Sequence, residues 1–362
     1  MMCSRRLCLI ASVIALSLNL SPVMGQADTP VINATNIDQL KPVEAIDFAS
    51  LPAEAGTILN GRMYVSSDSR HLAVVNRDGQ VVFLSDIGEL LEVTDPILTP
   101  DGFPATFIDG AFDPSGQRFG AIHTAGSAYI VSLFTIRGQA ETRRVPSDDK
   151  PVGIWLDARY LWLEVLPQDS ASAPYLVRIA YATGPLASAT LETKPLVLAG
   201  DTEAVARIGR LPPPYAVTAA ENGRVSRWDL SAGHRTGLAQ VSDVPIYGAL
   251  TPDGRYLAWR DPASMALHEL DFATGQDRVV ITLRGTYIPF ILLTLRADVI
   301  LGIDIGGEPK IAAWDVATGK MHDLGLYRQC QRPPDMVSLT LDGTTVALGC
   351  DTGLEVWQID GR

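Results

Sequence analysis

The side chains able to do acid–base or metal chemistry are widely spaced in this 362-residue chain. A protein metal site needs three or four His, Cys, Asp or Glu side chains at ligand spacing. His268-Glu269 has no second histidine at the spacing of a zinc helix, and a strand is predicted there. The five histidines stand in different parts of the sequence, at His71, His123, His234, His268 and His322. We therefore expect turn or strand-surface histidines and neither a metal nor another cofactor.

Nucleophilic chemistry has no local signature either. A Gly-x-Ser-x-Gly elbow, a phosphate-binding glycine loop and a calcium loop are all missing from the sequence. Cys330 and Cys350 are the cysteines that would remain after removal of an export leader. If they pair, the disulfide closes a loop of about 20 residues; the alternative is two separate small hydrophobic side chains.

Composition and charge limit the class of protein. Charged residues make up 19% and hydrophobic residues 47% of the chain, and 31 Gly with 24 Pro supply frequent turns. This composition suits many short strands better than long helices. The formal net charge of -12 repels phosphate backbones and anionic lipid, so we expect no nucleic acid and no membrane surface as partner.

Residues 1–27 have the order of a secretory signal peptide. Arg5-Arg6 precede an apolar run from Leu7 to Leu20, and the small residues around Gly25-Gln26-Ala27 follow it. The run is shorter than the roughly 20 residues of a membrane-spanning helix, so an uncleaved anchor is the alternative. We expect a secreted or periplasmic protein, in a compartment where disulfides persist.

An internal repeat of about 40 to 50 residues organises the rest of the chain. Val225-Ser-Arg-Trp-Asp-Leu-Ser-Ala-Gly recurs as variants starting at Ala266 and Ile311, with aspartates at 229, 271 and 315, and a shorter copy starts at Leu354. A strand-turn-strand unit precedes the last three copies, at Leu250, Leu293 and Leu339. Related units at Ser66, Phe112 and Trp155, with a weaker one at Tyr215 before the Val225 copy, bring the number of repeats to seven. Several of them contain the Asp-Gly or Ser-Gly turns of short hairpins.

Trp228-Asp229 and Trp314-Asp315, with the Asp-Gly hairpins before them, resemble the WD40 repeat family and its YVTN-like relatives. The resemblance covers most of residues 60–362 and departs from the family in lacking the upstream Gly-His dipeptide. It implies an all-β fold, a seven-bladed β-propeller of four-stranded antiparallel blades. Ala313-Trp-Asp-Val-Ala-Thr-Gly-Lys also resembles the repeat of quinoprotein propellers, but Asp323 stands where that family has a closing Trp.

Ring closure follows from counting strands. The last repeat ends after three strands, and residues Val43 to Leu51 form an extended segment before the first complete repeat. Pairing this segment with the C-terminal blade completes four strands and covers a sheet edge. The expected organisation is a signal peptide at 1–27, an N-terminal extension at 28–42 and the propeller at 43–362, as a monomeric domain.

Binding residues are sought among loops that the blade pattern leaves free. The turn residues Asp68, Asp113, Asp253, Arg255 and Asp342 occupy hairpin positions that the repeat requires. Loops between blades, and between second and third strands, share the opposite face, where exposed aromatic and Arg side chains favour binding. The candidates there are Asp148, Asp149, Tyr247, Asp261, Tyr287, Asp304 and Arg328.

These observations favour an exported, non-catalytic scaffold that binds a protein or peptide. The alternatives are a propeller hydrolase or lactonase with a site at the channel mouth and, from the resemblance above, a quinoprotein-like propeller. A stoichiometric divalent metal in the purified protein would favour the enzyme.

Overall fold

The computed structural model describes residues 30–362 with short gaps, and the statements below concern the described residues. The gaps are residues 67, 69, 86–87, 148, 169–174, 183, 196–204, 208–214, 221–222, 230–233, 242–247, 252, 262–263, 284–290, 305–309, 328–335, 341–342, 351 and 360–362. The predicted signal peptide and part of the predicted extension, residues 1–29, lie outside the described part.

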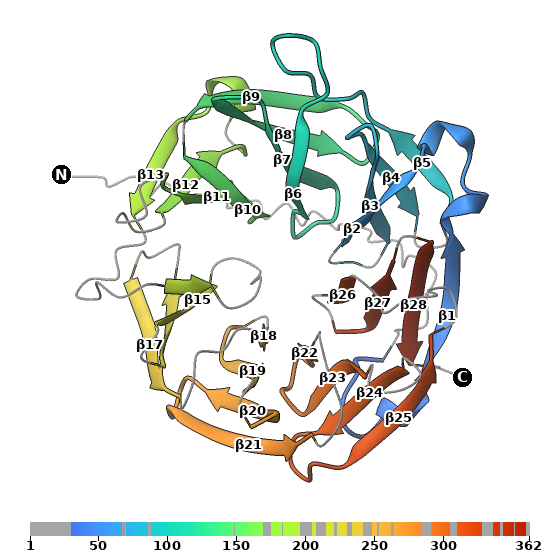
Figure 1. Cartoon of the computed structure of the whole chain (residues 1–362), viewed down its shortest axis with the longest axis vertical. Coiled ribbons are helices and arrows are strands. Elements are labelled where there is room, and N and C mark those ends of the chain that lie inside the picture. Colours follow the sequence, from blue (N-terminus) through green and yellow to red (C-terminus); the bar gives the residue numbers. More distant parts are fainter. Residues whose placement is uncertain are drawn as a thin grey trace, which may run out of the picture.

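The described strands form seven four-stranded antiparallel sheets, which stand as blades around a ring (Figure 1). Within a blade, the first strand is innermost and the fourth is outermost. Blade 1 consists of β2 (Ile58–Val65), β3 (His71–Asn76), β4 (Val81–Ser85) and β5 (Leu90–Val93). Blade 2 consists of β6 (Thr106–Phe112), β7 (Arg118–Thr124), β8 (Ala128–Thr135) and β9 (Ala140–Pro146). Blade 3 consists of β10 (Lys150–Leu156), β11 (Tyr160–Leu166), β12 (Tyr175–Ala180) and β13 (Leu191–Pro195). Blade 4 consists of β14 (Val205–Arg207), β15 (Tyr215–Ala220), β16 (Arg224–Asp229) and β17 (His234–Gln240).

The remaining three blades continue around the ring. Blade 5 consists of β18 (Gly248–Leu250), β19 (Tyr256–Arg260), β20 (Ala266–Asp271) and β21 (Gln276–Thr282). Blade 6 consists of β22 (Ile291–Leu293), β23 (Val299–Asp304), β24 (Lys310–Asp315) and β25 (Met321–Leu326). Blade 7 is β26 (Met336–Leu339), β27 (Thr345–Gly349), β28 (Gly353–Ile359) and β1 (Leu40–Asp47). The predicted seven-bladed fold is confirmed, and the WD-like segments are the third strands of their blades.

Burial between neighbouring blades explains the sequence pattern of the middle strands. In β8, seven consecutive residues from Ala128 are buried, and β19 and β24 are nearly as apolar. A strand covered on both faces reads as a continuous apolar run, because each face packs against another blade. The outermost strands β21 and β25 are largely exposed. The core of the protein is therefore a series of interfaces between blades.

The N-terminal strand closes the ring as predicted. β1 pairs antiparallel with β28, from Leu40 opposite Ile359 to Asp47 opposite Gly353. The strand starts three residues earlier than the predicted Val43, because Pro42 is accommodated inside it at an irregular pairing between Pro42 and Glu44. An outermost strand tolerates proline, which lacks an N–H to donate. The chain then leaves the sheet in the 3-10 helix η2 (Phe48–Ser50), within the predicted segment.

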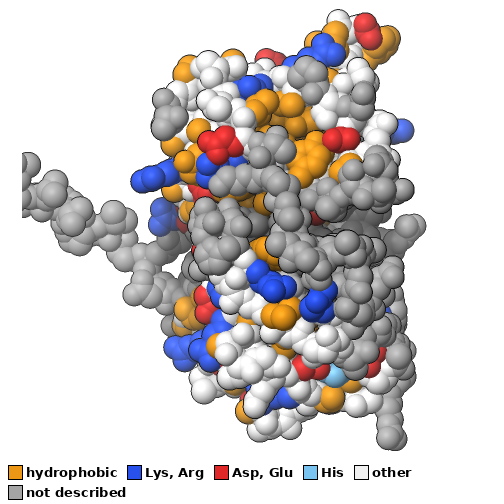
Figure 2. Space-filling view, turned by 90° about the vertical axis from the view of Figure 1, so that its left-hand side faces the viewer, with side chains coloured by type: hydrophobic (Ala, Val, Ile, Leu, Met, Phe, Trp, Pro, Cys, Tyr) orange, Lys and Arg blue, Asp and Glu red, His pale blue; other side chains and the backbone are white. Residues whose placement is uncertain are grey.

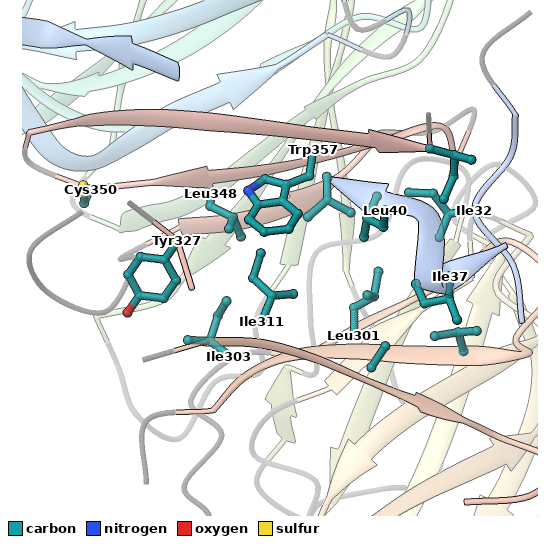
Figure 3. Close-up of a cluster of buried hydrophobic side chains, with 14 residues drawn as sticks. Ile32, Ile37, Leu40, Leu301, Ile303, Ile311, Tyr327, Leu348, Cys350 and Trp357 are labelled. Carbon is teal, nitrogen blue, oxygen red and sulfur yellow. The ribbon is translucent and has the colours of Figure 1, made fainter. Parts of the chain in front are cut away.

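Residues 30–39, ahead of the closing strand, pack between blades 6 and 7. Ile32 and Ile37 are buried with Leu40 among Leu301, Trp357 and other side chains of those two blades (Figure 3). The backbone N–H of Ile32 donates to the Gly343 carbonyl oxygen at 2.9 Å. This part of the predicted extension is an ordered wedge.

Candidate binding surface

Strand order divides the loops between two faces of the ring. The connection face carries the links between successive blades and the loops between second and third strands. The turn face carries the loops between first and second strands and between third and fourth strands. Of the seven candidate residues, Asp149, Asp261 and Asp304 lie in connection-face segments or at the strand end beside one. Asp148, Tyr247, Tyr287 and Arg328 lie outside the described residues.

Asp149 holds two connection-face loops together. Its carboxylate accepts a hydrogen bond from the Tyr175 hydroxyl at 2.7 Å and another from the backbone N–H of Gln168 at 3.1 Å. Burial and the bond to Asp149 both raise the pKa of Tyr175. Asp149 is thus engaged inside the protein, between the link from blade 2 to blade 3 and the next loop of blade 3.

Asp261 and Asp304 also have internal partners. Asp261 is 8% exposed and accepts a hydrogen bond from the Ser264 hydroxyl, which ties the loop between β19 and β20. Asp304 ends β23 and lies close enough to Lys310 to contribute to the raised pKa of that amine, whose main cause is the hydrogen bond to Asp323. Asp149 and Asp261 therefore have structural roles in their loops.

Cys350 stands at the end of β27, at the start of a connection-face loop, and is 1% exposed. Its predicted partner Cys330 lies outside the described residues, so the pairing stays a prediction.

The turn acids have the local role that the repeat suggested. In blade 5 the Thr251 hydroxyl donates to Asp253 at 2.6 Å and accepts from the Tyr256 backbone N–H at 3.0 Å. Blade 1 repeats the scheme with Ser66 and Asp68. In blade 2 a single residue, Asp113, accepts from the backbone N–H groups of Gln117 and Arg118. These side chains satisfy turn amides that would otherwise lack partners; Asp342 lies outside the described residues.

The histidines make no metal-binding group in the described part of the chain, where no three or more His, Cys, Asp and Glu side chains cluster. His268 Nδ1 lies 2.9 Å from an Asp277 oxygen, and the other Asp277 oxygen accepts from the Trp259 indole at 3.0 Å. His123 is fully buried, and burial lowers the pKa of His123 to about 4, with a smaller opposite effect from the Gly79 backbone.

Residues 97–105 form a hairpin that the blade pattern did not predict. It lies in the link from blade 1 to blade 2, on the connection face, and is the topmost part of the molecule in Figure 1. Thr99 N–H donates to the Phe103 carbonyl oxygen at 2.7 Å, and Phe103 N–H donates to the Thr99 hydroxyl at 3.2 Å. Gly102 takes a φ of 81°, the left-handed conformation that favours glycine at such a turn.

The 97–105 hairpin rests on blade 2 and exposes its tip. Its base residue Ala105 packs with Ala125 and Ile130 of blade 2 in a small buried cluster joined by Ile97. Phe103 is 70% exposed and Leu98 is 50% exposed. In Figure 2 the same topmost part of the molecule carries hydrophobic and acidic side chains at its end. The hairpin therefore presents two apolar side chains from an internally hydrogen-bonded, packed base.

The other large hydrophobic side chains exposed in the described residues are spread singly around the rim. They lie on outermost strands, at Val43, Leu91, Leu191, Leu238, Val279, Met321 and Leu326. Single exposed hydrophobics are normal on protein surfaces, whereas the 97–105 hairpin exposes two large ones in nine residues.

A sequence signal for the hairpin was present. Leu98-Thr-Pro-Asp-Gly repeats the five residues Leu250-Thr-Pro-Asp-Gly of the turn in blade 5, but it stands between two blades. An extra turn out of phase with the repeat marks an insertion with no role inside a blade.

The fold of this chain resembles that of solved β-propeller structures. The chain is similar to the crystal structure of the Myceliophteria_thermophila Cps50 (Swd1) β-propeller domain, with a TM-score of 0.58 and 12% identity over 89% of this chain and 100% of that domain. This chain has the fold of a WD40-like β-propeller. At such low identity the likeness concerns the fold alone.

Comparison by sequence adds no family: no protein-family model matches this propeller, and no curated protein matches it. Among the described residues, we find no helix with the length and apolar character needed to cross a bilayer.

Proposed function

We propose that this propeller is an exported, non-catalytic scaffold whose connection face binds a protein partner through the 97–105 hairpin. The observation that carries the proposal is the exposure of both Phe103 and Leu98 in one hairpin with a packed base. Burying an aromatic side chain with a neighbouring apolar one is the typical source of binding energy at a protein interface.

Preorganisation adds to this argument. Binding by a loose loop loses part of the contact energy to ordering of backbone and side chains. The described hairpin already has its backbone hydrogen bonds and a buried cluster at its base. Phe103 also loses little rotamer entropy when it is covered, because it has two side-chain torsions.

A photo-crosslinking experiment tests the proposal. The photoreactive residue p-benzoylphenylalanine replaces Phe103 in one variant and Val279 in another, and each is irradiated in the native extracytoplasmic fraction. Val279 is the matched control, because it is 56% exposed on the outermost strand of blade 5, outside the connection face. We expect a discrete crosslinked band from position 103 that is absent from position 279.

The crosslinked partner is then purified and titrated against wild type and the Leu98→Ser, Phe103→Ser variant. Loss of about 2–4 kcal/mol of binding free energy is expected for a hot spot of this kind. No crosslink at position 103, or equal binding by wild type and the double variant, would contradict the proposed binding face.

Export is a separate part of the proposal, supported by the order of charges and apolar residues in residues 1–27. Mass spectrometry of the protein from the extracytoplasmic fraction should give a chain starting near residue 28. A chain that keeps its first 27 residues would support the alternative, an uncleaved anchor.

A further inference from the structure

The 97–105 hairpin contains the same five residues as a turn of blade 5, and the two copies use their aspartates differently. Leu-Thr-Pro-Asp-Gly stands at 98–102 in the hairpin and at 250–254 between β18 and β19. In both copies the glycine N–H donates to the threonine carbonyl oxygen, at 2.9 Å from Gly102 and at 2.7 Å from Gly254. Because the five residue types are identical, a difference at the carboxylate comes from the chain that follows.

In blade 5 the turn binds its own carboxylate. Asp253 accepts a hydrogen bond from the Thr251 hydroxyl at 2.6 Å and another from the Arg255 backbone N–H at 3.0 Å. The turn closes between Thr251 and Tyr256, where the Tyr256 N–H donates to the Thr251 hydroxyl. The aspartate is therefore used by the turn itself, as in other Asp-containing turns.

The hairpin turn is one residue shorter, and this difference leaves the carboxylate of Asp101 unbound. The turn closes between Thr99 and Phe103, where the Phe103 N–H donates to the Thr99 hydroxyl at 3.2 Å. No residue corresponds to Arg255, so the N–H that binds Asp253 has no counterpart in the hairpin. Among the described residues, Asp101 accepts no hydrogen bond and forms no ion pair, and it is exposed.

The unbound carboxylate and the exposed phenyl ring belong to the same tight loop. An antiparallel bridge between Leu98 and Pro104 brackets residues 99–103. Asp101 therefore lies at the end of the hairpin, two residues from Phe103, which is 70% exposed. The topmost part of the molecule in Figure 2 carries acidic and hydrophobic side chains together at its end. The hairpin thus offers a negative charge beside its apolar side chains.

The link that carries the hairpin is acidic. Residues 94–105 contain two exposed aspartates, Asp95 and Asp101, and neither Lys nor Arg. The turn between β3 and β4 of blade 1 adjoins the base of the hairpin, because a Cβ added to its glycine would meet the Ala105 carbonyl oxygen at 3.3 Å. This turn adds Arg77 and Asp78, which carry opposite charges.

Blade 2 supplies a further cation near the hairpin base. Arg144 of β9 is exposed and stands opposite Ile130, which belongs to the buried cluster under the hairpin. No ion pair joins Arg144 to Asp101 in the described part of the chain. Of the five charged groups named here, three are acidic, so the two arginines do not neutralise the hairpin and its surroundings.

We propose that the partner of the 97–105 hairpin presents an apolar surface bordered by a basic side chain, which pairs with Asp101 while Phe103 and Leu98 contact the apolar part. This inference rests on the binding face proposed above and adds the chemistry of its partner. A guanidinium group suits the site, because it pairs with a carboxylate through two parallel hydrogen bonds and also stacks on an aromatic ring. The net charge of -12 attracts such a partner from a distance.

The test compares two variants that each remove one exposed acid from the connection face. Asp101→Asn removes the carboxylate of the hairpin, and Glu54→Gln is the control, in the 3-10 helix η3 (Ala53–Ala55) of the link from blade 7 to blade 1. Each full-length protein is titrated with a short fluorescein-labelled peptide of alternating Arg and Leu. A peptide with Glu in place of each Arg is the reference, and both titrations are made at low and at high salt.

We expect Asp101→Asn to bind the Arg-Leu peptide about 3- to 5-fold more weakly than Glu54→Gln at low salt, as for an exposed ion pair. The difference should disappear at about 0.5 M salt, because screening weakens exposed charge pairs. The Glu-Leu peptide should not bind Asp101→Asn more weakly than it binds Glu54→Gln. Melting temperatures should stay unchanged, since neither carboxylate has a partner in the described residues.

Equal titrations of the two variants with the Arg-Leu peptide, with or without measurable binding, would overturn the inference. The Leu98→Ser, Phe103→Ser variant separates this failure from failure of the proposed function. If that variant loses the peptide while Asp101→Asn keeps it, the hairpin binds apolar groups without a charge requirement, and only the inference fails. If the double serine variant binds the peptide as wild type does, the apolar contact is absent and both proposals fail.

Discussion

On the turn face, several blades repeat one hydrogen-bonding scheme, whereas on the connection face the described loops differ in length and in contacts. Thr251 and Asp253 of blade 5 make the same bonds as Ser66 and Asp68 of blade 1. The 97–105 hairpin has no counterpart among the other described links between blades. The repeat therefore constrains one face of the ring and leaves the other to individual loops.

The faces also differ in what remains for binding once the fold is satisfied. On the turn face the aspartates are bonded within their turns, and exposed arginines stand beside them in the sequence. On the connection face Asp149 and Asp261 anchor loops, and the exposed apolar group comes from an insertion. Apolar recognition is therefore expected on the connection face.

Deleting the N-terminal wedge and β1 should have the largest effect on stability, because it opens the ring that carries both faces. Deletion of residues 30–47 exposes the sheet edge of β28 and removes the buried side chains of Ile32, Ile37, Leu40 and Ile46. At about 1.5–3 kcal/mol for each buried side chain, the loss is roughly 6–12 kcal/mol. This is comparable to the whole stability of a typical domain.

The measurement for this prediction is thermal unfolding followed by circular dichroism. The deletion variant should show no cooperative transition, and a chain lacking residues 1–29 is the control that should keep one. A cooperative transition at the wild-type temperature in the deletion variant would disprove the closure role of β1.

The connection face should depend on a disulfide. Cys350 is buried at the start of a connection-face loop, and Cys330 is the cysteine that is predicted to pair with it. Closing a loop of this size stabilises a folded protein by about 3 kcal/mol in the chain-entropy view. We expect Cys350→Ser and Cys330→Ser to lower the unfolding free energy equally in denaturant titrations. Two free thiols on the exported protein would contradict the pairing.

Acid should lower the free energy of unfolding through one histidine near each face, over different pH ranges. His123 lies near the connection-face end of its strand, and His322 follows a turn of the turn face. The pKa of His123 is lowered from 6.5 to about 4 by burial. Between pH 6.5 and about pH 4 the unfolded chain takes up a proton on this histidine and the folded chain does not. The free energy of unfolding therefore decreases by up to about 3 kcal/mol as the pH is lowered. His123→Phe should flatten this part of the profile.

The ion pair of the turn face should act at lower pH. The hydrogen bond from His322 is the main cause that holds the pKa of Asp38 below its ordinary 3.8. A lowered carboxyl pKa contributes stability above the unfolded value, and this contribution is lost as the pH falls through the folded value. Urea titrations at several pH values test both statements. An unchanged pH profile for His123→Phe would show that another group causes the acid sensitivity.

The smallest expected effect compares one threonine from each face. Thr251→Val removes the buried hydroxyl that donates to Asp253 and accepts from the Tyr256 N–H, so it should cost about 1–3 kcal/mol. Thr99→Val in the exposed hairpin removes a bond that water can replace, and we expect less than about 0.5 kcal/mol. Chemical denaturation of both variants measures the difference. Equal costs would mean that the repeated turn scheme carries no special stability.

Much of the fold was predictable because its information is local and repeated. Seven blades, antiparallel strands, the turn aspartates and the closing N-terminal strand follow from apolar runs, Asp-Gly turns and the count of strands. Strand order also places the described candidates Asp149, Asp261 and Asp304 on one face. β1 starts at Leu40, earlier than the predicted Val43, because a proline within an outermost strand does not end the strand.

The sequence by itself determined the architecture, because each strand and turn is specified by neighbouring residues and the repeat confirms each one several times. It did not determine which polar or apolar side chains are left over after folding. That Asp149 and Asp261 are engaged within the protein, that Phe103 is not covered, and that Ile32 fills a gap between blades 6 and 7 depends on contacts between residues distant in sequence. Burial and hydrogen-bond satisfaction are properties of the packed ring, so only the tertiary structure decided them.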